Sequence, residues 1–452
     1  MSTSISIHGQ WSTRLAFVLA ATGSAVGLGN IWRFPYIAGE NGGGAFVLVY
    51  LACIVGIGLP LMMAEILVGR RGRQSPINTM RSIAREEGLS RAWTLVGWFG
   101  VVAGFLILSF YSVVAGWSMA YVFKAAGGVF AGLDAAGSEA LFGGMVGQAE
   151  ILLAWHTIFM VMTAMVVARG VQPGIERAVT VLMPALFLLL LLLVGYAVVN
   201  GSFREGFEFM FRADFSALST NAVLIAMGQA FFTLSLGMGA IMVYGSYLSQ
   251  SASIARVSVT VISLDTLVAV LAGLAIFPIV FAVGLEPSQG PGLIFVSLPI
   301  AFAEMPGGLW LGTAFFVLLV FAAWTSAISL IEPAVAFLVE NVGWTRVAAT
   351  TAVSVAAWLL GIGALLSLNV WSDYTLFGKG VLDFLDYLTA NVLLPLGGFF
   401  VAVFVGWRMT TRSVQSELAL GHRVLFQIWL MLLRFVVPVA ILLIFLRAIE
   451  LI

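Results

Sequence analysis

The chain has 452 residues, of which 61% are hydrophobic and only 9% charged, and its formal net charge is zero. A soluble protein of this length needs more charge to cover its surface, so the composition excludes an ordinary water-soluble domain. A neutral chain also lacks the basic field that nucleic acids require. Apolar runs of about 20 residues, the length at which a helix crosses bilayer hydrocarbon, recur along the whole sequence. We therefore predict a multi-pass membrane protein.

The hydrophobicity pattern predicts eleven membrane helices in chain order. They cover residues 13–37, 44–69, 92–124, 151–168, 175–199, 221–247, 257–284, 309–340, 345–368, 378–407 and 426–448. A shorter apolar stretch near 291–303 is interrupted by Pro291, Pro299 and Pro306. Because it is too short to span, we expect it to form a re-entrant or surface hairpin.

Arginine and lysine are distributed unequally between the predicted loops. The loop at 70–91 holds six arginines and other loops on that side hold eight more, whereas the opposite side holds five basic residues. Basic loops stay on the cytoplasmic side, so we expect a cytoplasmic N-terminus and, after eleven spans, an external C-terminus. The short outer loop at 127–150 has no cysteine, which favours a bacterial inner membrane.

Two predicted helices carry glycines and small polar residues in the middle of the span. They contain GSAVGLGN at 23–30 and FFTLSLGMG at 231–239, five helices apart. Glycine lets a membrane helix break, and breaks at matching places in two halves are typical of inverted-repeat transporters with a site at the midplane. The freed N–H groups would face a carboxylate and the freed carbonyls a cation. For the first segment alone, a G-x-x-x-G packing face is an alternative.

Ionisable residues inside the predicted spans are few. Each is costly in hydrocarbon, which makes each a functional candidate. They are Arg33, Glu65, Asp265, Glu332 and Arg434. For Glu332 and Arg434 we favour structural roles, either pairing or reaching toward a membrane face.

These segments resemble the neurotransmitter:sodium symporter family, the transporters of the LeuT fold, over essentially the whole chain. The most specific parts are GSAVGLGNIWRFPY at 23–36 with ENGGG at 40–44, and GQAFFTLSLGMG at 228–239 is nearly as specific. The bacterial branch with eleven helices fits best, near the multi-hydrophobic amino acid and tyrosine transporters.

The resemblance implies an all-α membrane protein with a LeuT-like 5+5 inverted repeat. The first repeat would occupy residues 1–200, the second 201–410, and the extra helix eleven 411–452, with helices one and six unwound. It implies a sodium-coupled symporter of neutral, bulky hydrophobic or aromatic L-amino acids that works by alternating access. Glycine or a GABA-like carboxylate is an alternative substrate, and an amino-acid sensor that does not transport is an alternative activity.

By matching position, the resemblance implies two sodium sites. The first would combine the substrate carboxylate with oxygens of Ala25, Asn30, Thr233 and Asp265. The second would combine carbonyls and hydroxyls of Gly23, Val26, Ala322, Thr325 and Ser326. Such oxygen ligands suit a hard cation.

The resemblance also implies a substrate pocket of small and apolar residues. Its members are Ser24, Ala25, Gly29, Ile107, Tyr111, Phe232, Ser235, Met238, Ser326 and Leu330. The Tyr111 hydroxyl would donate to the substrate carboxylate, and Glu65 would accept N–H groups of broken helix six. Amine-transporting relatives carry an acidic residue where this chain has Gly27, so the substrate is expected to bring its own carboxylate.

Gates are implied at both ends of this pathway. Arg33 and Asp386 would pair as the outer gate, with Phe232 as a lid. Trp11, Tyr247 and Glu340 would form the inner latch, in which His8 replaces an arginine of the family.

Chloride-dependent members of the family hold the anion among a tyrosine, a glutamine and hydroxyls. The matching positions are Tyr50, Gln229, Thr233 and Ala269, so the crucial serine is absent, while Asp265 lies one helical turn away on the same face. A carboxylate there would offset the sodium charge, which predicts chloride-independent transport. A carboxylate can also take up a proton once sodium has left, which would allow proton counter-transport; the alternative is that Asp265 is only a sodium ligand with a fixed charge.

Three other classes of function compete with transport. An intramembrane hydrolase using Glu65 and Asp265 lacks support, because the sequence contains no H-E-x-x-H, G-x-S-x-G or P-loop motif. A channel needs neither coupling sites nor occluding gates at both ends. A sensor would normally carry an added signalling domain. We therefore predict that the chain is not an enzyme and that its partners are sodium, an amino acid and the bilayer.

Overall fold

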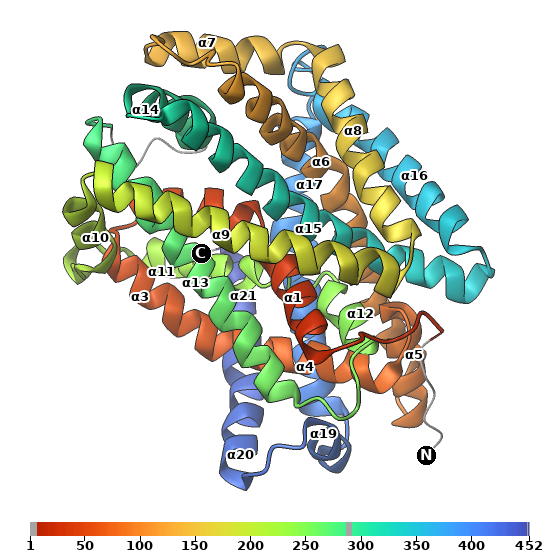
Figure 1. The fold of residues 1–452 in the computed structure, drawn as a ribbon. Helices are drawn as coiled ribbons and strands as arrows, with labels where there is room; N and C mark the ends of the chain where they lie inside the picture. The colour runs from red at the N-terminus through yellow and green to blue at the C-terminus, as the bar shows by residue number, and fades with distance from the viewer. Residues whose placement is uncertain (1–6, 286–291, 450, 452) are drawn as a thin grey trace.

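The computed structural model describes residues 7–285, 292–449 and 451, and its architecture is helical (Figure 1). The first half of the chain forms α1 (Arg14–Ala25), α2 (Phe34–Glu40), α3 (Gly44–Cys53), α4 (Leu59–Gly72), α5 (Pro76–Glu86), α6 (Thr94–Ala126), α7 (Ala135–Val146), α8 (Ala149–Ala168), α9 (Arg177–Asn200) and α10 (Phe203–Phe211). The second half forms α11 (Thr220–Thr233), α12 (Ala240–Ser246), α13 (Ile254–Ala282), α14 (Leu298–Glu304), α15 (Gly308–Val342), α16 (Arg346–Leu366), α17 (Val381–Tyr387), α18 (Leu394–Val403), α19 (Thr411–Leu418), α20 (Arg423–Met431) and α21 (Val437–Ala448). Short π-helical turns join several neighbours into single rods, such as Ile54–Gly58 between α3 and α4.

Membrane-spanning length is reached by most of these rods. Within the described residues, nine helical segments are long and apolar enough to cross a bilayer, and the bent pair formed by Arg14–Ala25 and Gly29–Glu40 would make a tenth. The predicted span at 221–247 is divided into α11 and α12 by a non-helical stretch at 234–239. Neither half is long enough to span alone, which is the interruption that the glycine-rich sequence predicts.

Two long helices form the centre of the bundle. α6 and α15 pack along each other, and α8 and α16 pack beside them (Figure 1). In α15, 78% of the most apolar window is buried inside the protein, whereas the corresponding window of the rod from Arg423 to Ala448 is only 28% buried. An apolar helix with so little protein around it must face lipid, so the C-terminal rod lies at the periphery.

The two helix breaks have different backbone causes. The first follows α1, where Val26 takes an extended ψ of 104° and the chain bends by 54° before α2. The second contains Ser235, Gly237 and Gly239, all with positive φ. Gly237 also approaches the backbone so closely that a Cβ atom would lie 2.4 Å from the Leu394 carbonyl oxygen. Only glycine satisfies both conditions at that position.

The short apolar stretch between α13 and α15 is not a hairpin, and that prediction was wrong. Residues Leu293–Glu304 form one helix that ends in α14. Pro299 follows the junction of the π-helical turn Leu293–Ser297 with α14, and the helix continues through it. The hydroxyl of Tyr121 donates to the Phe295 carbonyl at 2.9 Å and anchors this helix to α6. Pro291 lies outside the described residues.

The bundle has two distinct ends. α7 and α14 lie at one end, and the segment before α1, α5 and α19 lie at the other (Figure 1). We call the second the N-terminal end and the first the opposite end. α1 and α12 lead from the two breaks toward the N-terminal end, and α2 and α11 lead from them toward the opposite end.

Candidate functional site

The two helix breaks face each other across a small cavity at the centre of the bundle. The cavity has a volume of about 40 Å³. All ten residues predicted for the substrate pocket line it: Ser24, Ala25, Gly29, Ile107, Tyr111, Phe232, Ser235, Met238, Ser326 and Leu330. The Ser235 hydroxyl donates to the Ser24 carbonyl oxygen at 2.7 Å, which joins the two breaks directly.

A buried carboxylate lies next to Thr233, which lines this cavity. Asp265 of α13 is 0% exposed. Its Oδ1 accepts from Asn30 Nδ2 at 2.8 Å and its Oδ2 from the Thr233 hydroxyl at 3.3 Å. No ion pair among the described residues includes Asp265. A buried carboxylate with only neutral donors is costly unless a cation joins it, so these residues fit a sodium ion.

A second oxygen cluster lies where α15 passes the break after α1. The Ser326 hydroxyl is 3.3 Å from the Gly23 carbonyl oxygen and 3.2 Å from that of Val26. The neighbouring Thr325 hydroxyl is 3.1 Å from the Ala322 carbonyl oxygen. Five neutral oxygens on two elements match the preference of a hard monovalent cation, and every member predicted for the second sodium site is among them.

Tight packing at Gly27 shapes the polar end of the cavity. A Cβ atom there would lie 2.7 Å from the Ser326 hydroxyl oxygen and 3.1 Å from that of Tyr111. The Leu28 N–H donates to the Tyr111 oxygen at 3.4 Å. A side chain at position 27 would therefore displace Ser326 or Tyr111, and the glycine leaves room for both hydroxyls beside the break.

Glu65 supports the second break from α4. Its side chain is 1% exposed, and its Oε1 accepts from the Gly237 N–H at 2.7 Å. The break exposes backbone donors that the helix no longer satisfies, and the carboxylate takes one of them. This is the contact that the resemblance implies.

A larger cavity, which we call the vestibule, opens from the central cavity toward the opposite end. Its volume is about 540 Å³, and its lining includes Arg33, Tyr111, Phe232, Asp383 and Asp386. The Arg33 guanidinium lies 5.0 Å from the centre of the Phe232 ring. The ion pairs of the described residues do not join Arg33 to Asp386. The predicted pair is therefore not formed in this conformation, because the vestibule separates its two walls.

The N-terminal end is closed by aromatic packing. Trp11 is 5% exposed; its backbone N–H donates to the Tyr247 carbonyl at 3.1 Å and its indole Nε1 to the Tyr244 carbonyl at 3.0 Å. Both tyrosine rings also contact the indole edge-on. The segment before α1 is thus bound to α12 by two hydrogen bonds and by ring contacts.

The polar contacts of the three predicted latch residues fall into two groups. The Tyr247 hydroxyl donates to Glu332 Oε1 at 2.6 Å, not to Glu340. Glu340 Oε1 instead lies 3.0 Å from His8 Nε2 and accepts from the Ser75 N–H at 2.7 Å. Tyr247 therefore binds Glu332 of α15. Glu340, at the end of the same helix, binds His8 and Ser75.

Comparison with known proteins settles the family. The profile of the Sodium:neurotransmitter symporter family matches residues 8–131 and 142–452. The chain belongs to this family. Its members are transporters rather than enzymes.

The relatives of this transporter agree along its whole length. It is 41% identical over 443 residues to the uncharacterized sodium-dependent transporter YhdH of Bacillus subtilis, with 97% of each chain covered. It is 34% identical over 455 residues to an uncharacterized sodium-dependent transporter of Haemophilus influenzae, with 98% and 99% covered. Its fold matches the crystal structure of MhsT in complex with L-phenylalanine with a TM-score of 0.89 and 45% identity, over 97% of this chain and 99% of that one. The chain is therefore a sodium-dependent transporter of the LeuT fold.

Sequence reasoning missed the partners of one buried charge. Arg346 of α16 forms an ion pair with Glu332, which is 0% exposed and also binds the Tyr247 hydroxyl. A glutamate in the middle of a predicted span, Glu332, indicated that a partner was needed. The sequence did not identify that partner, because Arg346 belongs to another helix. Arg434, the other predicted structural residue, donates to the Gly406 carbonyl and lies over the Trp407 ring.

Proposed function

We propose that this transporter couples the inward movement of a neutral L-amino acid with a bulky apolar or aromatic side chain to sodium. The observation that carries the proposal is the chemistry of the central cavity. Its polar groups gather at the helix breaks and Tyr111, while Ile107, Phe232, Met238 and Leu330 line it with apolar surface. Such a site holds a zwitterion at one end and an uncharged side chain at the other.

The packing at Gly27 supports a substrate that carries a carboxylate. Gly27 has no side chain, and a Cβ atom there would lie only 2.7 Å from Ser326 Oγ and 3.1 Å from Tyr111 Oη, so the protein supplies no carboxylate at this position. The substrate carboxylate would bind the Tyr111 hydroxyl and the N–H groups of the break, next to the sodium ion held by Asn30 and Asp265. A charged substrate side chain would have no partner among the apolar residues. The L-phenylalanine bound in MhsT fits the same description.

Two sodium ions would drive the cycle. The first would sit with Ala25, Asn30, Thr233 and Asp265 and contact the substrate directly, which couples the two. The second ion would hold the break after α1 against α15. Its ligands would be Gly23, Val26, Ala322, Thr325 and Ser326. Residues 1–200 and 201–410 would be the two repeats that move against each other, with the N-terminal end in the cytoplasm and the C-terminus outside a bacterial inner membrane.

Uptake of radiolabelled L-phenylalanine into proteoliposomes tests the proposal. We expect uptake only with an inward sodium gradient, competition by leucine, tyrosine and tryptophan, and none by lysine or dopamine. The double substitution of Thr325→Ala with Ser326→Ala should abolish sodium stimulation. Thr313→Ala is the matched control, because that hydroxyl lies in the same helix and only binds the Leu309 carbonyl at 2.6 Å. Sodium stimulation that survives in the double variant, or tight binding of glycine or GABA alone, would overturn the proposal.

Chloride would not be needed. Ala269 is fully buried and has no donor for an anion, while the Asp265 carboxylate already places a negative charge beside Asn30 and Thr233. Two sodium ions and a zwitterion carry a net positive charge, which this carboxylate offsets at short range. Replacing chloride by gluconate should leave uptake unchanged in the wild type. Asp265→Asn should fail in both media, and a wild type that stops without chloride would contradict the role of Asp265.

Proton counter-transport would follow from the same carboxylate. Once sodium and substrate have left, Asp265 would face the cavity with only Asn30 and Thr233 as partners, and a proton would neutralise it during the return step. A pH dye inside the vesicles should report alkalinisation of the lumen during sodium-driven uptake, because each return carries a proton outward. A pH that stays constant during full uptake would remove this part of the proposal and leave the symport intact.

A further inference from the structure

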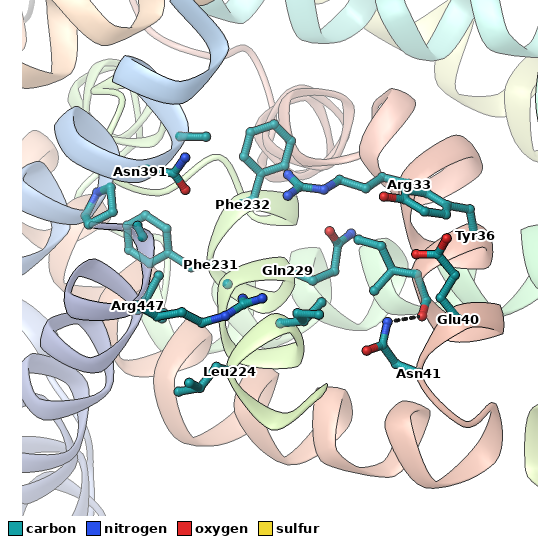
Figure 2. A pocket seen from close by; sticks show the side chains of 17 residues that line it. Arg33, Tyr36, Glu40, Asn41, Leu224, Gln229, Phe231, Phe232, Asn391 and Arg447 are labelled. Atoms are coloured by element: carbon teal, nitrogen blue, oxygen red, sulfur yellow. Dashed lines mark hydrogen bonds between the residues drawn. The ribbon is translucent and has the colours of Figure 1, made fainter. Parts of the chain in front are cut away.

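The polar groups on the two sides of the central cavity differ in how they are bonded. Toward the opposite end, Arg33 and Arg447 line a cavity of about 260 Å³ and belong to no ion pair of the described residues (Figure 2). Where α1 meets α15, by contrast, the hydroxyls of Ser24, Ser326 and Ser329 all have hydrogen-bond partners. Ser329 belongs to neither predicted sodium site and does not line the central cavity, so its hydrogen bonds need another explanation.

Ser329 joins α15 to the end of α1. Its hydroxyl donates to the Ser326 carbonyl, one turn earlier in α15, at 2.7 Å, and it accepts from the Ser24 hydroxyl at 2.8 Å. Both members of the second bond are buried, since Ser24 is 2% and Ser329 is 1% exposed. A serine hydroxyl has only one proton to donate. Because Ser329 gives its proton to its own helix, its oxygen is left to accept the proton of Ser24.

Ser24 is the residue at which three elements meet. Its carbonyl oxygen accepts from the Ser235 hydroxyl of the second break at 2.7 Å, and its own hydroxyl binds Ser329 of α15. Its chain neighbours Gly23 and Ala25 are predicted ligands of different sodium ions. Two hydrogen bonds in different directions restrict the rotation of Ser24, and this restriction sets the directions of the carbonyl groups on either side of it.

The bond between Ser24 and Ser329 lies one helical turn from the second oxygen cluster. The Ser326 hydroxyl, three residues earlier in α15, lies 3.3 Å from the Gly23 carbonyl oxygen and 3.2 Å from that of Val26. Residues three apart share one face of a helix, so both contacts join the same sides of α1 and α15. The contacts of the cluster use oxygens that a sodium ion would bind, whereas the bond between Ser24 and Ser329 uses none of them. This bond can therefore hold the two helices together before an ion arrives and after it has bound.

We propose that Ser329 is a positioning residue for sodium binding. Through Ser24, it holds the end of α1 against α15, so that the carbonyl oxygens around the break already face the two ion sites. Without this bond, part of the binding free energy of sodium would be used to order the break. The sodium affinity would then fall, but saturating sodium would still order the break and restore the shape of the cavity. The proposal rests on the two sodium sites of the proposed function and not on the identity of the amino acid.

A sodium titration of thermal unfolding tests this role without any amino acid. The purified full-length transporter is heated in mixtures of sodium chloride and choline chloride at constant ionic strength, because a ligand that binds the folded state raises the unfolding temperature. In Ser329→Ala, the sodium concentration that gives half of this rise should be about 2- to 10-fold higher than in the wild type, the equivalent of one hydrogen bond. Ser354→Ala is the matched control and should not change this concentration, because Ser354 is a buried serine of α16 whose hydroxyl has no partner among the described residues.

A second substitution shows whether Ser329 acts through Ser24. Ser24→Ala removes the other half of the same bond and keeps the backbone carbonyl, so it should raise the half-maximal sodium concentration to a similar extent. It also keeps the test decisive if Ser329→Ala does not fold. The double variant should be no worse than either single variant, because only one bond is lost. Effects that add up in the double variant would overturn the action through Ser24, and a sodium titration of Ser329→Ala that matches the wild type would overturn the positioning role.

Binding of L-phenylalanine separates positioning from a direct effect on the cavity. At saturating sodium, Ser329→Ala should bind this amino acid as tightly as the wild type does, whereas at low sodium its affinity should be lower. An equal loss at both sodium concentrations would overturn the proposal, because the substitution would then act on the cavity itself. A wild type whose unfolding temperature does not respond to sodium would refute the proposed sodium sites and this proposal with them. Sodium stabilisation without binding of L-phenylalanine would refute only the proposed substrate, and the sodium titration would still decide the role of Ser329.

Discussion

The two ends of the bundle are built on opposite principles, although the same two broken helices supply both. At the N-terminal end, Trp11 and Tyr247 are buried and bonded across the pathway, and the charged groups below them are paired. At the opposite end, Arg33, Asp386 and Arg447 line open cavities and none of them forms an ion pair within the described residues. The closed end is held by burial, and the open end carries the charges that a closed state would pair. The structure is thus closed at the N-terminal end and open at the opposite end. Substitutions at the two ends should therefore have different effects on stability and on activity.

The largest effect is expected at the buried ion pair of the closed end. Glu332→Ala leaves the Arg346 guanidinium without its partner in a site where the glutamate was fully buried. Removing one member of a buried pair costs about 3–5 kcal/mol, so the thermal unfolding temperature of the purified transporter should fall sharply. Glu208→Ala is the control, because its pair with Arg204 is exposed and its loss should leave that temperature unchanged. Equal unfolding temperatures in the two variants would show that burial does not distinguish the ends.

A smaller effect at the same end isolates one hydrogen bond. Tyr247→Phe removes the hydroxyl that donates to Glu332 Oε1 at 2.6 Å but keeps the ring against Trp11. A hydrogen bond to a charged group contributes about 1.5–3 kcal/mol, so the latch should open more often. The rate at which a thiol reagent from the N-terminal side modifies Ser24→Cys reports that opening and should rise. Tyr196→Phe, which loses a hydroxyl bonded to the Pro306 carbonyl at the surface, should leave the rate as it was.

The comparison of the ends also shows what sequence could and could not predict. The glycines around Gly237 predicted the second break. The structure gives the reason, because positive φ and a close backbone approach at Gly237 both require glycine. The pocket residues followed from the family resemblance. The ion pair between Glu332 and Arg346 could not be predicted, because it depends on which turns of the two long helices α15 and α16 face each other. The separation of Arg33 from Asp386 could not be predicted either, because a sequence does not specify which conformation of a gate is populated.

At the open end, we expect activity to change without stability. Asp386→Asn removes a charge that lines the vestibule and is unpaired in this conformation. Exposed charges contribute about 0–1 kcal/mol, so the unfolding temperature should stay near that of the wild type. Uptake should fall by roughly tenfold, the equivalent of about 1.4 kcal/mol, because the closed state loses its ion pair with Arg33. Asp383→Asn is the matched control, since Asp383 lines the same cavity; equal losses in both variants would show a general need for negative charge instead of a gate.

The smallest effect is expected where the closed end has spare hydrogen bonds. Glu340 lies 3.0 Å from His8 Nε2, but it also accepts from the Ser75 N–H and from Asn78 Nδ2, both at 2.7 Å. His8→Ala removes one of three partners, so the latch should lose about 0.5–1.5 kcal/mol, the usual net contribution of one hydrogen bond. Glu340→Ala removes all three and should open the N-terminal end further, as measured by the same modification of Ser24→Cys. In His8→Arg, the rate of Ser24→Cys modification should stay at the wild-type value or fall below it, because a guanidinium binds a carboxylate with two parallel hydrogen bonds. If His8→Ala opened the latch as far as Glu340→Ala, the histidine alone would hold this end. The hydrogen bonds from Ser75 and Asn78 to Glu340 would then not contribute to closure.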